Sequence, residues 1–164
     1  MLCGQLEGHL YRDVFSTVYS DDEEGGHFAA LAMKERGRKD IVAVLGPQDN
    51  PAVVDRLRGY RAVLGEDLPD ANVIYTGWNN GDGYQAMHQI LAREIAFDGV
   101  LCGSDRIAAG VITALNEAGL SVPADVSVVA STITRLRRAA SPRSRPSASP
   151  CAKKATWPPT LRST

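Results

Sequence analysis

The chain has 164 residues, of which 44% are hydrophobic and 23% charged. This composition is typical of a soluble globular protein, and the length suits one domain with its own core but not two. No apolar run reaches the roughly 20 residues of a membrane helix, and the start lacks a secretory signal, so we expect a cytoplasmic protein that does not contact membranes. The net charge of −1 averages an acidic part, residues 1–132 with 10 basic and 19 acidic side chains, and a basic part, residues 133–164 with 8 and none.

Apolar runs and helical patterns alternate through the middle of the chain. In chain order we expect a helix over 27–37, a strand over 40–47, a helix over 51–66, a strand over 72–78, a helix over 81–94, a strand over 98–104, a helix over 105–120 and a strand over 126–130. The run "DIVAVLGP" is continuously apolar and ends at Gly46-Pro47, as a strand buried on both faces does. This alternation predicts an α/β fold, a doubly wound parallel sheet with helices on both faces.

After Ala130 the apolar residues show neither the helical nor the strand period. Arg, Ser, Pro and Ala dominate 135–164, and such a composition buries too little apolar surface to offset the entropy of ordering. We therefore expect a disordered basic C-terminal tail over 133–164.

Ligands of open parallel sheets bind where the loops leave the carboxyl ends of the strands. These loops are "GPQDNP", "GWNNGDG" and "GSD". Ser104 and Asp105 lie where a strand ends and a helix begins, so they are either an N-cap pair, worth about 1 kcal/mol, or ligand contacts. Arg56 comes early in a helix that begins beside a strand end, where most arginines are solvated. Trp78 follows a strand directly, where a large aromatic is harder to explain by packing alone, although it could equally cover the sheet edge.

Other chemistries are weakly supported. The loop "GWNNGDG" lacks the GxGxxG and Walker patterns of nucleotide sites, and "CGSDR" lacks the second glycine of a nucleophile elbow. Cys3, Cys102 and Cys151 have no CxxC or Cys/His spacing, which argues against a disulfide framework and a zinc site. We expect no enzyme activity and no cofactor.

Three stretches together resemble the effector-binding core of LacI-type (lactose-repressor-type) transcription regulators. They are "DDEEGGHFAALAMKERGRKDIVAVLGP", "DRLRGYRAVL" and, the most specific, "FDGVLCGSDRIAAGVITALNEAGLSVPADVSVVA". The resemblance spans about residues 17–130. It implies a periplasmic-binding-protein-like pair of α/β subdomains with a small ligand, often a sugar, held between them.

Carried over by position, the resemblance assigns ligand contacts to Arg56, Trp78, Ser104 and Asp105. A guanidinium offers a fork of donors, an indole face covers C–H groups, and short polar side chains fix orientation. The family binds DNA through a helix-turn-helix, a pattern we do not find in this chain, and its intact members form homodimers. We expect the helix at 105–118 to contribute mainly sheet-facing core, with a fringe for dimerisation, from Ile107, Ala108, Val111, Ile112 and Leu115.

The family motif V-G-(F/Y)-D-D would place a ligand-binding aspartate near Thr132, where this chain reads "VASTITR". Adding one base after the codon of Val129 allows V-G-I-D-D-H-P to be read, and the same frame turns "PRSRPSASP" into P-P-L-T-T-V-R-V-P. Our hypothesis is that a one-base loss near Ala130 put the tail out of frame. A genuine basic arm that contacts DNA phosphates is the alternative.

The sequence therefore predicts three parts: a remnant of a preceding subdomain or linker over 1–16, an effector-binding α/β subdomain over 17–132, and the tail. The predicted function is sensing of a small sugar-like effector in a transcription regulator. A transport-type sugar-binding protein and a Rossmann-like nucleotide-dependent enzyme are the alternatives, because both share the alternation.

Overall fold

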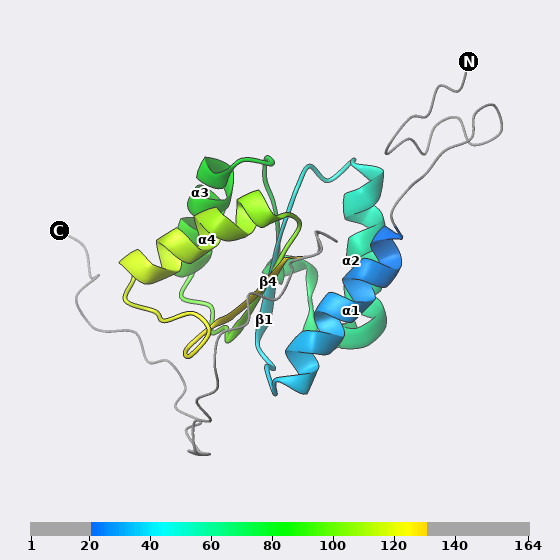
Figure 1. Cartoon of the computed structure of the whole chain (residues 1–164), viewed down its shortest axis with the longest axis horizontal. Helices are drawn as coiled ribbons and strands as arrows, with labels where there is room; N and C mark the ends of the chain where they lie inside the picture. The colour runs from blue at the N-terminus through cyan, green and yellow to red at the C-terminus, as the bar shows by residue number, and fades with distance from the viewer. Residues whose placement is uncertain (1–20, 131–164) are drawn as a thin grey trace, which may run out of the picture. The chain divides into compact units, whose positions relative to one another are not determined.

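The computed structural model describes residues 21–130 (Figure 1). Its elements in chain order are α1 (Asp22–Glu35), β1 (Ile41–Leu45), α2 (Pro51–Leu64), the short 3₁₀ helices η1 (Gly65–Asp67) and η2 (Asp70–Asn72), β2 (Val73–Tyr75), α3 (Asn80–Ala92), β3 (Gly99–Cys102), α4 (Asp105–Glu117) and β4 (Ser127–Ala130). The predicted segments 1–16 and 133–164, with the basic tail and the proposed change of frame, lie outside the described residues.

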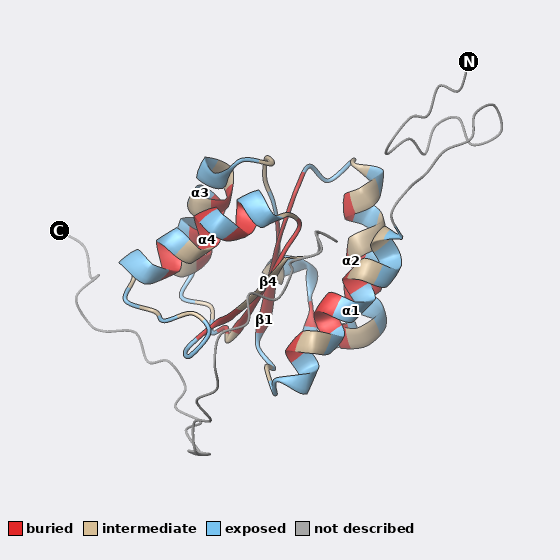
Figure 2. Cartoon of the chain, viewed as in Figure 1, coloured by how far each residue is buried: buried red, intermediate tan, exposed pale blue. Residues whose placement is uncertain are grey.

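The four strands form one sheet in the order β2-β1-β3-β4, with every neighbouring pair parallel. The first strand, β1, thus lies inside the sheet. The chain then adds β2 at one edge and crosses to the other side of β1, where it adds β3 and β4. The α/β class and the doubly wound parallel sheet are confirmed. All five residues of β1 and all four of β3 are buried, as a central strand covered on both faces requires (Figure 2).

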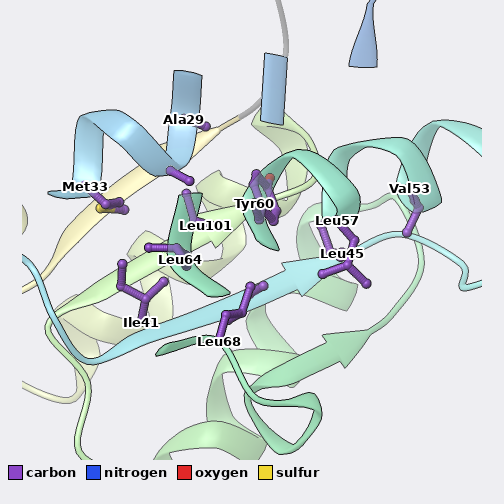
Figure 3. Packing of buried hydrophobic residues seen from close by; sticks show 12 residues of the cluster. Ala29, Met33, Ile41, Leu45, Val53, Leu57, Tyr60, Leu64, Leu68 and Leu101 are labelled. Carbon is purple, nitrogen blue, oxygen red and sulfur yellow. The ribbon is translucent and has the colours of Figure 1, made fainter. Parts of the chain in front are cut away.

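Two helices cover each face of the sheet: α1 and α2 lie on one side, α3 and α4 on the other (Figure 1). Because side chains alternate along a strand, Ile41, Ala43 and Leu45 of β1 point to the first face. There they join buried residues of α1, α2, β3 and the segment between η1 and η2 (Figure 3). The cluster consists of Ala29, Ala30, Met33, Ile41, Ala43, Leu45, Val53, Leu57, Tyr60, Leu64, Leu68 and Leu101.

Both helix pairs pack backbone against backbone at glycines. A Cβ added to Gly59 of α2 would lie 2.1 Å from the carbonyl oxygen of Glu23 in α1. A Cβ added to Gly110 of α4 would lie 1.9 Å from the carbonyl oxygen of Asn80 in α3. Glycine at these two positions is therefore required by the close approach of each pair.

The amino-terminal edge of the sheet is held by Arg38. Its guanidinium donates to Ser127 Oγ at 2.9 Å and to the carbonyl oxygens of Pro123, Ala124 and Asp125. The segment that leads into β4 is thus fixed to the turn that leads into β1.

The element boundaries differ from the prediction most at the end of β2, which stops at Tyr75 and not at 78, and at the start of α1. This helix begins at Asp22, five residues before the predicted start at 27. Asp21 is the cause, because its side-chain oxygen accepts a hydrogen bond from the backbone N–H of Glu24 at 2.9 Å and so satisfies a free donor of the first turn. The glycines Gly25 and Gly26 are consequently helical.

Candidate functional site

The carboxyl ends of the strands meet at one edge of the sheet, because all neighbouring pairs are parallel. Leu45 of β1 is level with Tyr75 of β2, and Val44 is level with Cys102 of β3. Two backbone hydrogen bonds extend the ladder past the strand ends, from Thr76 N–H to the Leu45 oxygen at 2.9 Å and from Gly103 N–H to the Val44 oxygen at 2.8 Å. The loops predicted to carry the site therefore start side by side.

Trp78 lies over Gly46. A Cβ added to Gly46 would be 2.4 Å from the indole Cζ2, so only glycine leaves room for the ring at this place. The half-buried indole also packs against the cluster beneath α1 and α2. Both interpretations of Trp78 stay open, since the residue packs against the core cluster and is only half-buried.

Ser104 caps α4. Its Oγ accepts a hydrogen bond from the backbone N–H of Ile107 at 3.3 Å, and its extended backbone (φ −157°, ψ 164°) is that of an N-cap residue. Asp105 is exposed in the first turn of the same helix, where a carboxylate interacts favourably with the helix dipole. The capping interpretation is confirmed for Ser104, and the ligand role of both residues stays a prediction.

Arg56 is held by two partners. Its Nε and Nη2 donate to Asp22 Oδ1 at 2.9 and 2.7 Å, and its Nη1 donates to the carbonyl oxygen of Gly103. The side chains of Arg56 and Asp22 are 14% and 10% exposed. The prediction that the guanidinium is solvated is therefore wrong. The group lies next to Gly103, the residue before the α4 cap Ser104.

Asp22 was missed by the sequence reasoning. It lies 34 residues before Arg56, and a carboxylate in the first turn of a helix is explained by the helix dipole without any partner. The signal that could have found it is the pair of acidic residues Asp21-Asp22 at a helix start, of which only one can be the N-cap.

The edge offers hydrogen-bonding chemistry more than catalysis. The Trp78 indole contacts Gly46, the Arg56 guanidinium donates to the Gly103 oxygen, and Ser104 and Asp105 follow Gly103 at the start of α4. Burial raises the pKa of the Cys102 thiol at the end of β3, so the sulfur stays protonated and is a poor nucleophile. Within residues 21–130 no group of three or more His, Cys, Asp or Glu side chains is arranged to hold a metal ion, and no helix is long and apolar enough to span a bilayer.

Comparison with known proteins gives a consistent result. The profile of the periplasmic binding protein-like domain matches residues 30–147. The HTH-type transcriptional repressor PurR of Pectobacterium atrosepticum is 38% identical over 125 residues, which cover 74% of this chain and 37% of that protein. The chain thus spans well under half the length of the curated relatives that it matches.

Solved structures agree. The transcriptional regulator CelR in complex with cellobiose superposes with a TM-score of 0.69 at 32% identity, over 77% of this chain and 40% of that one. A LacI family transcriptional regulator from Enterococcus faecalis V583 with bound ribose superposes with a TM-score of 0.68 at 30% identity, over 76% and 45%.

Proposed function

This chain belongs to the periplasmic binding protein-like domain family, in the form found in LacI-type transcription regulators, and on that basis we propose that it senses a small sugar-like effector at the carboxyl edge of its sheet. The observation that carries the proposal is the convergence of Trp78, Ser104 and Arg56 around Gly46 and Gly103. An aromatic face beside short polar groups is the chemistry that a sugar ring needs, apolar on its C–H side and hydrogen-bonding at its rim.

Two relatives of known structure support the ligand class, since one is a cellobiose complex and the other holds ribose. The proposed contacts in this chain are Arg56, Trp78, Ser104 and Asp105. Arg56 can serve a ligand beside its structural role, because three of its five N–H groups donate to Asp22 and Gly103 and two remain for a ligand hydroxyl.

In the full regulator, effector binding would shift a two-state closure that changes affinity for DNA. DNA contact is assigned to a helix-turn-helix, which the name of the curated relatives includes. The partners proposed for the regulator are therefore the effector, operator DNA and a second copy, and the place proposed for it is the cytoplasm. We propose binding without turnover, because the curated relatives are named as transcriptional repressors.

The test is a thermal-shift screen of the chain with ribose, cellobiose, NAD and ATP. A sugar should raise the melting temperature. W78A should lower the affinity for that sugar by about tenfold or more, the loss expected for truncating a central aromatic contact. F28A is the matched control, since Phe28 is a 57% exposed aromatic on α1. Stabilisation by NAD or ATP alone would favour the nucleotide-enzyme alternative and contradict the proposal.

A further inference from the structure

The Asp22–Arg56 pair is unlike the other ion pairs on these helices. Both Nε and Nη2 of Arg56 donate to the same carboxylate oxygen, at 2.9 and 2.7 Å, and both side chains are largely withdrawn from water. The neighbouring pair of Arg58 with Glu23 is 57% and 49% exposed. Charge compensation at Arg56 is therefore strong, whereas that at Arg58 is screened by solvent.

The backbone fixes where the pair lies. A Cβ added to Gly26 of α1 would lie 2.3 Å from the carbonyl oxygen of Arg56, so α1 and α2 touch at the very residue that carries the guanidinium. The third contact, from Nη1 to the Gly103 oxygen, anchors the other end of the group at the strand edge. Arg56 thus meets any ligand from a fixed position with its charge already matched.

Carboxylates also meet the positive ends of three helices at this edge. Asp82 accepts a hydrogen bond from the backbone N–H of Asn79 at the start of α3, and Asp105 lies in the first turn of α4. At the start of α1, Asp21 accepts a hydrogen bond from the backbone N–H of Glu24. The charged side chains of the strand-end loops and of the first two helical turns at this edge include the guanidinium groups Arg56 and Arg106 and a larger number of carboxylates, namely Asp21, Asp22, Glu23, Glu24, Asp49, Asp55, Asp82 and Asp105. The net field at the edge is therefore unfavourable for an anion.

We infer that Asp22 sets the charge class of the effector: by cancelling the charge of Arg56, it makes the site take an uncharged polyol and reject phosphorylated or carboxylated analogues. The inference rests on the proposed role of this edge as the effector site. Arg56 then acts as a directional hydrogen-bond donor to hydroxyl groups, and removal of the Asp22 charge turns it into an anion site.

The test measures inorganic phosphate binding to the whole chain, by titration at constant ionic strength with amide and Arg56 Nε–H chemical shifts as the signal. The natural protein should bind phosphate only weakly, and D22N should bind it at least about tenfold more tightly, since a neutralising charge at hydrogen-bond distance has been removed. E23Q is the matched control, because it makes the same change of net charge one residue away, at the exposed pair with Arg58.

Equal phosphate affinity in the natural protein and D22N would overturn the inference, and so would an equal gain in E23Q. If D22N does not fold, as judged by circular dichroism, R56Q decides: the account predicts equally weak phosphate binding in R56Q and the natural protein, and a loss of phosphate binding in R56Q contradicts it. Failure of the proposed function looks different, because a phosphate gain in D22N without any sugar binding would retain the charge effect and reject the sugar effector.

Discussion

Replacing Gly110 with alanine should force α3 and α4 apart. The added Cβ would lie 1.9 Å from the Asn80 oxygen and 2.6 Å from the Tyr84 nitrogen, whereas non-bonded heavy atoms pack best at about 3.5 Å. Both obstacles are backbone atoms, so no side chain can rotate out of the way, and α4 must move by more than an ångström from its partner. Ile107 and Val111, both fully buried on α4, would lose contacts as it moves.

Overpacking of this kind costs about 3 kcal/mol, and the better helix propensity of alanine returns about 1 kcal/mol. The net loss of about 2 kcal/mol is a large share of the total stability of about 5–15 kcal/mol expected for a small domain. The assay is urea unfolding followed by far-UV circular dichroism, with the midpoint and the slope fitted separately.

The matched control for this change is G81A, in the first turn of α3. A Cβ added to Gly81 meets nothing within 4 Å, so alanine should leave stability unchanged or raise it by up to about 1 kcal/mol. If G110A proved as stable as G81A, the helices would not be held at backbone contact and the packing argument would be refuted.

Three further changes test the fold and its edge. Burial raises the pKa of the Cys102 thiol, so this group stays protonated in the folded protein but ionises above about pH 8.5 in the unfolded chain. The free energy of unfolding should therefore fall by up to about 1.4 kcal/mol per pH unit above that value. Urea melts of C102A at increasing pH should lack this part of the decrease. R38Q should cost about 1–3 kcal/mol in urea melts, because it removes the donor to four oxygens, while K39Q on an exposed side chain should cost little. S104A should cost about 1 kcal/mol through loss of the α4 cap, and an unchanged midpoint would contradict the capping geometry.

The fold was largely predictable because its signals are local. The uninterrupted apolar run at 41–45 indicates a strand buried on both faces, and Pro51 and Gly119 mark a helix start and a helix stop. The order β2-β1-β3-β4 was not predicted, since strand order depends on contacts between distant segments.

The site was predictable only in part, for the same reason. Ser104 as an N-cap follows from its own neighbours. The contact of Trp78 with Gly46 follows from the pairing of β1 with β2, and the partners of Arg38 lie 85 to 89 residues away. Asp22 could not be assigned to Arg56 until the close approach of α1 and α2 was known.

The central claim, a sugar-sensing edge, is tested most directly by recording amide spectra of the chain during titration with ribose and cellobiose. The account predicts saturable shifts at Gly46, Trp78 and Ser104, and none at Arg38 or Asp98 on the opposite edge of the sheet. Shifts confined to the opposite edge, or a response only to NAD or ATP, would contradict it.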